Sequence, residues 1–222
     1  MILSFRHRFL FLKTKKSAGT SLEIALSAIC GPEDIITVIS EEDQAARRAF
    51  GFPGPQNHII RDIRNVKGGV PREHKFFNHM SYSDVRIRLP QVNLDDFFIF
   101  AVERDPVDRM MSLYHFQGGD ERWGSLDNWL ENPKSAKFQG FDLYHDDQGE
   151  CKADKIYFYE ALDSACEDLS VRFGAEVKMP EYRAKGNYRK SREIPPLSDK
   201  VKHWLRENFS REYAAYHYEP PV

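Results

Sequence analysis

Cysteine is scarce in this sequence, with three residues in a chain of 222. Cys30, Cys151 and Cys166 are an odd number and form no C-x-x-C pair. This pattern argues against a disulfide framework and against a structural zinc site. Free thiols suit a reducing compartment, so we expect a cytoplasmic protein.

Long hydrophobic runs and a strong net charge are also lacking. Within residues 1–16 the apolar run is Phe9–Leu12, much shorter than a signal-peptide core or a membrane span. The 32 basic and 34 acidic residues leave a formal charge of −2, so no global positive field attracts nucleic acid or anionic lipid. We expect neither nucleic acid nor a membrane as a partner, and any anion site must be local.

The composition does provide enough apolar material for a core. Hydrophobic residues make up 41% of the chain and charged residues 30%, which fits one ordinary domain over residues 1–222. Glycine, proline and polar residues interrupt the stretch from Ser40 to Lys75, which we interpret as an insertion at about 40–75. A structureless loop of that length is usually functional or mobile, so this insertion is a candidate lid over an acceptor cleft.

Short apolar runs at residues 9–12, 97–102 and 156–159 predict three buried strands, and each is followed by a helical period. The expected apolar stripes are Leu22, Ala25, Leu26 and Ile29; Val107, Met110, Met111 and Tyr114; and Leu162, Cys166, Leu169 and Phe173. A last helix is expected near residues 198–209. This alternation predicts an α/β fold with a central parallel sheet flanked by helices on both faces.

The stretch from Lys13 to Ser21 lies between the first predicted strand and the first predicted helix. Small residues there let backbone N–H groups approach an anion, and a helix N-terminus favours negative charge. Lys16 adds a positive charge, while Thr20 and Ser21 add hydroxyl groups. The ATP-binding pattern G-x-x-x-x-G-K-S/T is absent. The alternative is a helix start that is simply capped by its own Thr or Ser.

A second polar group follows the second predicted strand. Arg104 ends that strand, and Ser112 lies eight residues further on, in the next helix. In an open α/β sheet, ligands bind outside the carboxyl ends of the strands, so Arg104 is placed to bind a phosphate through its planar fork of N–H groups. The alternative is that Arg104 pairs with a neighbouring acidic residue, Glu103, Asp105 or Asp108.

These two segments resemble the two nucleotide-binding motifs of one enzyme family. Residues 16–21, KSAGTS, resemble K-T/S-G/A-G-T-S, the 5′-phosphosulfate loop of the sulfotransferases that use 3′-phosphoadenosine 5′-phosphosulfate (PAPS). Residues 104–114 are similar to their 3′-phosphate motif, R-D/N-P-x-x-R-x-x-S-x-Y/F. The branch most resembled contains carbohydrate sulfotransferases of the heparan 2-O type and uncharacterised bacterial members. Residues 156–162 and the final helix running to Tyr218 are similar more loosely.

The resemblance implies a fold like that of the P-loop NTPases and a role for each motif residue. Lys16 would hold the bridging oxygen between sulfate and phosphate. The 5′-phosphate would be held by Ser17, Ala18, Gly19, Thr20 and Ser21, and the 3′-phosphate by Arg104 and Ser112. The sulfuryl group would pass by in-line displacement to a hydroxyl, leaving 3′-phosphoadenosine 5′-phosphate (PAP), with no metal required.

A base must take the proton of the acceptor hydroxyl, and the candidate for this base is His79. It follows Phe76-Phe77 and precedes a predicted helix start, and the family often has its catalytic histidine in a similar short segment. Glu103 and His58 are the alternatives. A basic stretch with interleaved tyrosines follows near the C-terminus, where Lys185 and Tyr188 are candidate contacts to the nucleotide.

Two other functions remain open at this stage. One is a non-catalytic module that binds an adenine nucleotide or a glycan, and the other is a kinase with a degenerate P-loop. The acceptor is expected to be a small molecule or a saccharide. No motif in the sequence selects between these two classes.

Overall fold

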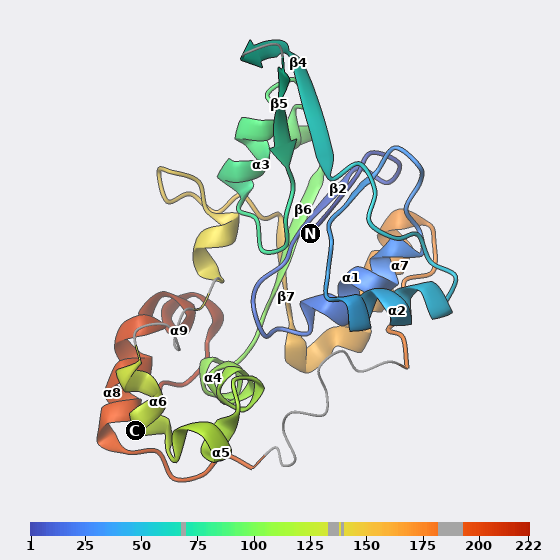
Figure 1. Cartoon of the computed structure of the whole chain (residues 1–222). Helices are drawn as coiled ribbons and strands as arrows, with labels where there is room; N and C mark the ends of the chain where they lie inside the picture. The colour runs from blue at the N-terminus through green and yellow to red at the C-terminus, as the bar shows by residue number, and fades with distance from the viewer. Residues whose placement is uncertain (68–69, 133–137, 139, 182–192) are drawn as a thin grey trace.

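The computed structural model describes residues 1–67, 70–132, 138, 140–181 and 193–222, and its centre is a five-stranded sheet (Figure 1). The strand order is β3-β1-β2-β6-β7. The bounds are β1 Ile2–Ser4, β2 Phe9–Leu12, β3 Ile35–Ile36, β6 Phe98–Glu103 and β7 Lys155–Phe158. The three predicted strands are therefore confirmed to within one residue, as β2, β6 and β7.

The sheet is mostly parallel. β2 pairs in parallel with β6, and β6 with β7, whereas β1 pairs antiparallel with both β2 and β3. β1 runs the other way because only four residues connect it to β2, which is too short for a crossover connection. The carboxylate of Asp34 fixes this connection by accepting hydrogen bonds from the Ser4 hydroxyl at 2.8 Å and the Phe5 amide at 2.7 Å.

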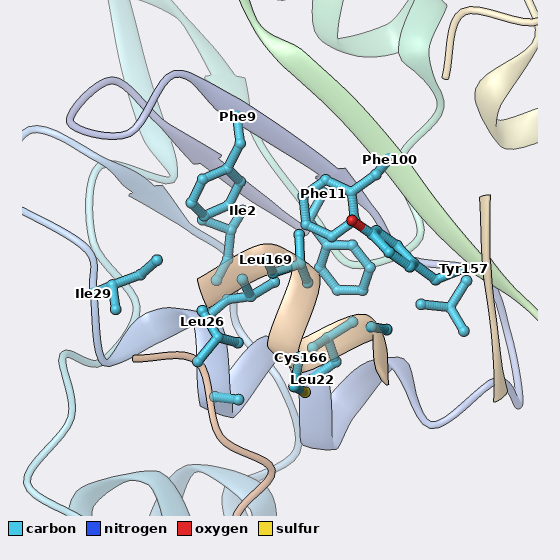
Figure 2. Packing of buried hydrophobic residues seen from close by; sticks show 14 of the residues in the cluster. Ile2, Phe9, Phe11, Leu22, Leu26, Ile29, Phe100, Tyr157, Cys166 and Leu169 are labelled. Atoms are coloured by element: carbon cyan, nitrogen blue, oxygen red, sulfur yellow. The ribbon is translucent and has the colours of Figure 1, made fainter. Parts of the chain in front are cut away.

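Helices cover both faces of the sheet, as predicted. On one face, α1 (Gly19–Ser27) and α7 (Leu162–Phe173) pack against a cluster of aromatic side chains from the strands. Figure 2 shows Phe9, Phe11 and Phe100 meeting Leu22 of α1 and Leu169 of α7. The alternate strand residues face the opposite side, where they pack against α3 (Tyr82–Arg88) and the 3₁₀ segments η1 (Leu94–Asp96) and η2 (Phe141–Tyr144).

Several helices from the second half of the chain form a third cluster with α4, the helix that follows β6. Asp105 caps α4 by accepting a hydrogen bond from the Asp108 amide at 2.8 Å, and Pro106 is its first residue, both as predicted. The bounds are α4 Pro106–Phe116, α5 Gly119–Trp123, α6 Leu126–Glu131, α8 Asp199–Asn208 and α9 Ser210–Tyr216. These helices lie together at the end of the molecule opposite to the hairpin formed by β4 (Ile59–Lys67) and β5 (Val70–Lys75) (Figure 1).

The insertion at about 40–75 is not a structureless loop, so that expectation is wrong. Ser40 caps α2 (Glu41–Ala49), which begins with acidic residues and ends with basic ones, in agreement with the helix dipole. β4 (Ile59–Lys67) and β5 (Val70–Lys75) then form an antiparallel hairpin that projects from the body of the protein (Figure 1). Its function as a lid stays a prediction.

Candidate functional site

The two polar motifs meet because β2 and β6 are parallel neighbours. Leu12, the last residue of β2, pairs with Ala101 of β6, so both strands end at the same edge of the sheet. The loop of residues 13–18 leaves β2 at this edge, and Arg104 directly follows β6. The structure thus brings together two segments separated by almost 90 residues, as the sequence predicted.

The loop has an unusual backbone. Lys16 and Ala18 have positive φ angles of 64° and 57°, a left-handed conformation that costs free energy in residues other than glycine. Left-handed residues alternating with other conformations turn successive N–H groups toward a common point, which makes a concave anion site. The hydroxyl of Ser17 lies 2.6 Å from that of Thr14, which in turn donates to the Val102 carbonyl. The side chain of Ser17 is therefore engaged inside the loop, and its amide is the group available to an anion.

Helix α1 begins without a side-chain cap. Its N-cap is Ala18, which cannot accept a hydrogen bond through its methyl group. Serine or aspartate side chains cap several other helices of the chain, namely Ser40, Ser81, Asp105, Ser125 and Ser198. The capped-helix alternative is therefore wrong for α1, and its first amides have the geometry of an anion site. Thr20 and Ser21 lie in this first turn and are 7% and 6% exposed.

Gly19 is required by close packing at the start of α1. A Cβ atom added there would lie 2.7 Å from Cγ of Lys13, closer than real contacts of this kind. Lys13 cannot move aside easily, because it is 1% exposed and its Nζ lies 2.8 Å from Oε2 of Glu23. Arg47 of α2 also contacts Glu23, at 3.3 Å. Burial raises the pKa of Glu23, but these cations outweigh it and lower the value to about 2.

Arg104 joins the second motif to the first. Its Nη1 donates to the Lys16 carbonyl at 2.9 Å, and its Nε donates to Asp108 at 2.7 Å. The guanidinium also lies 3.9 Å from the ring centroid of Tyr159. The expected pairing with an acidic neighbour is thus present, and it holds Arg104 against the loop. Tyr159 was not singled out as a site residue from the sequence, although it is the last residue of the predicted third strand and directly follows β7 in the structure.

Ser112 lies between two contacts on one side of α4. Residues 108, 112 and 116 are spaced by four and so form one stripe along the helix. Asp108 contacts Arg104, and the ring of Phe116 lies 4.1 Å from Nζ of Lys16. The same stripe therefore meets both cations of the candidate site, with the half-buried Ser112 between them.

His79 also reaches the loop. Its Nδ1 lies 2.8 Å from the Lys13 carbonyl oxygen, which can only accept, so Nδ1 carries the proton and Nε2 carries the lone pair. Burial, together with the charge of Lys13, lowers the pKa of His79 to about 3. The residue has φ 59° and precedes the Ser81 cap of α3. The strand before it is β5 of the β4–β5 hairpin, which is separate from the central sheet.

Comparison with known proteins decides the family. The model of the sulfotransferase family matches residues 1–219. The chain belongs to the sulfotransferase family. Searches of curated proteins and of solved structures find no match. The sheet order and the flanking helices are those of the P-loop-like α/β fold that the family shares. Membership of the family supports sulfuryl transfer as the general reaction.

Glu103 and His58, the two alternative candidates for the base of this sulfotransferase, have different surroundings. Glu103 is fully buried and accepts hydrogen bonds from Arg109 at 2.7 Å and from the Tyr144 hydroxyl at 2.9 Å. Burial raises its pKa, and Arg109 opposes that change. Nδ1 of the partly buried His58 has no hydrogen-bond partner among the described residues.

Two of the predicted nucleotide contacts of this sulfotransferase, Lys185 and Tyr188, lie outside the described residues. Within the described part of the chain, no group of three or more His, Cys, Asp or Glu side chains could hold a metal ion. A search of the same residues finds no helix that is long and apolar enough to cross a membrane.

Proposed function

We propose that this sulfotransferase transfers a sulfuryl group from PAPS to a hydroxyl group of a small molecule or a saccharide. One observation carries the proposal: the Arg104 guanidinium donates to the carbonyl of Lys16, in the loop at the uncapped start of α1. This contact holds a phosphate-binding cation beside a separate anion site. A donor with phosphate groups at both its 5′ and 3′ positions fits two such adjacent sites.

The loop would hold the 5′-phosphate through the amides of Ser17, Ala18, Gly19, Thr20 and Ser21. Lys16 would stabilise the charge that develops on the bridging oxygen as the sulfuryl group leaves. Arg104 and Ser112 would hold the 3′-phosphate. A guanidinium has five N–H groups, and the contacts of Arg104 with Asp108 and Lys16 engage three of them. Within the described part of the chain the other two make no such contact, and we propose that they bind phosphate oxygens.

His79 is proposed as the base that takes the acceptor proton. Its hydrogen bond to the Lys13 carbonyl fixes the tautomer with the lone pair on Nε2. The lowered pKa keeps this imidazole neutral at physiological pH, with its lone pair free of a proton. The negative charge of a bound donor would raise the pKa again, toward the range of an effective base. His79 follows β5, so the hairpin is attached next to the base, and we propose that it closes over the acceptor.

The finer assignments belong to the same proposal. The resemblance to the carbohydrate branch favours a saccharide acceptor, and the free thiols of Cys30, Cys151 and Cys166 favour a cytoplasmic location.

The direct test is PAP release in the presence of PAPS, without magnesium, over a panel of saccharides, phenols and simple alcohols. We expect PAP to accumulate with at least one class of hydroxyl acceptor and not in its absence. Nucleotide binding without turnover on any acceptor would favour the non-catalytic module. Transfer from ATP that requires magnesium would favour the kinase.

A further inference from the structure

We infer that Arg109 is a positioning residue that holds the 5′-phosphate loop in its anion-binding conformation. The inference rests on the proposed function and adds a role for a residue that is not among the phosphate contacts proposed above. Arg109 lies on α4 and is fully buried. Its Nε donates to the Lys15 carbonyl at 2.8 Å, and its Nη1 donates to Glu103 at 2.7 Å.

Two arginines therefore hold two successive carbonyls of the loop. Arg109 binds that of Lys15, and Arg104 binds that of Lys16. The peptide bonds are trans, so the C=O and the following N–H of each unit point in opposite directions. Fixing the Lys15 carbonyl turns the Lys16 amide away from Arg109, and fixing the Lys16 carbonyl turns the Ser17 amide away from Arg104. The two arginines thus set the orientation of these amides.

The guanidinium of Arg109 is held tightly in place. A Cβ atom added at Gly140 would lie 2.2 Å from its Nη2, so the glycine is needed for the side chain to fit. Phe138 and Phe209 have ring centroids 5.8 and 6.0 Å from its Cζ. With the charge of Glu103 beside it, this side chain has a defined position from which to fix the loop.

The partner Glu103 is itself oriented by a second hydrogen bond. Its Oε1 accepts from the Tyr144 hydroxyl at 2.9 Å, and that hydroxyl lies 2.9 Å from the hydroxyl of Tyr216. The network therefore runs from α9 through Glu103 and Arg109 to the loop. Loop conformations that left the Lys15 carbonyl elsewhere would leave a buried guanidinium N–H without its acceptor, which is unfavourable.

The test separates the two phosphate positions of the nucleotide. PAP carries both phosphates, AMP only the 5′-phosphate and adenosine 3′-phosphate only the 3′-phosphate. Arg109→Lys keeps the charge but cannot reproduce the fork to Lys15 and Glu103. We expect calorimetry to show about tenfold weaker binding of PAP and AMP, and binding of adenosine 3′-phosphate within about twofold of wild type.

Two further variants complete the test, one in the same network and one as a control. Glu103→Gln should weaken the binding of PAP and AMP but not that of adenosine 3′-phosphate. This variant keeps the test decisive if Arg109→Lys fails to fold. Arg88→Lys is the matched control, because Arg88 pairs with Asp84 at 2.7 Å on α3 and should leave all three affinities unchanged.

If Arg109→Lys weakened the binding of all three nucleotides equally, the inference would be overturned, because that result would indicate a general destabilisation of the protein. Unchanged AMP binding would overturn it as well. Failure of the proposed function looks different, since the wild-type protein would then show no preference for PAP over AMP.

Discussion

The guanidinium of Arg104 donates a hydrogen bond of 2.9 Å to the main-chain carbonyl of Lys16. This single contact joins the residue that ends β6 to the loop that follows β2. It requires the two strands to be parallel neighbours, which places their carboxyl ends together.

Lys16→Ala should slow sulfuryl transfer by about 10²–10³ while leaving PAP binding within about tenfold of wild type. The amine acts on charge that develops in the transition state, and loss of one such group typically costs about 10²–10³ in rate. Single-turnover PAP release and calorimetry measure the two quantities. Lys15→Ala, which removes the same charge from the adjacent loop position, is the control and should retain most of the activity. Unchanged transfer by Lys16→Ala would contradict this role.

His79→Asn should lower kcat by about 10²–10⁴, the usual contribution of a positioned base. Asparagine tolerates the left-handed backbone at this position better than most residues, so the fold should persist. His58→Asn is the comparison, because His58 is the alternative histidine. A larger loss of kcat in His58→Asn than in His79→Asn would reverse the assignment.

His79 should also make the protein less stable in acid. The pKa of this imidazole is about 3 in the folded protein and about 6.5 in the unfolded chain. Between these values the unfolded chain binds the proton and the folded protein does not, so stability falls as pH decreases from 6.5, by up to about 1.4 kcal/mol per pH unit. Urea unfolding at pH 6.5 and pH 4.5 should show a smaller loss for His79→Asn than for wild type. Equal losses would show that His79 does not contribute.

Gly19→Ala should destabilise the protein by about 1–3 kcal/mol and weaken PAP binding, because the new methyl group would meet the buried Lys13 side chain. Urea unfolding and calorimetry check the two effects. Gly54→Ala is the control, since a Cβ atom there has nothing within 4 Å and should change neither quantity. Normal PAP binding by Gly19→Ala would mean that the loop tolerates displacement of Lys13.

The parts of the fold that the sequence predicted are those with an unbroken apolar signal. β2 and β6 are buried on both faces, so their residues form continuous apolar runs. β1 and β3 were missed because three and two residues are too few to show a period. The hairpin was missed because β4 mixes charged and apolar residues along its length, and α2 because its nine residues are mostly charged.

The candidate site was predictable where a motif has fixed spacing, as for Lys16, Arg104 and Ser112. The contacts made by Arg109 were not, although the residue is part of the second motif, because its carbonyl partner lies 94 residues away in the loop and its carboxylate partner, Glu103, lies at the end of β6. The hydrogen bond from His79 to the Lys13 carbonyl joins residues 66 positions apart in the sequence. Such contacts depend on how the elements pack, which no local pattern encodes.

We propose that this sulfotransferase has a site for a nucleotide phosphorylated at both 5′ and 3′ positions. Calorimetry of PAP, AMP and ATP without magnesium, on wild type and Arg104→Ala, is the decisive test of that site. We predict that wild type binds PAP about 10–100-fold more tightly than AMP or ATP, and that the preference disappears in Arg104→Ala, because the charged hydrogen bonds to the 3′-phosphate are lost. Equal binding of the three nucleotides by wild type, or no binding, would contradict the claim.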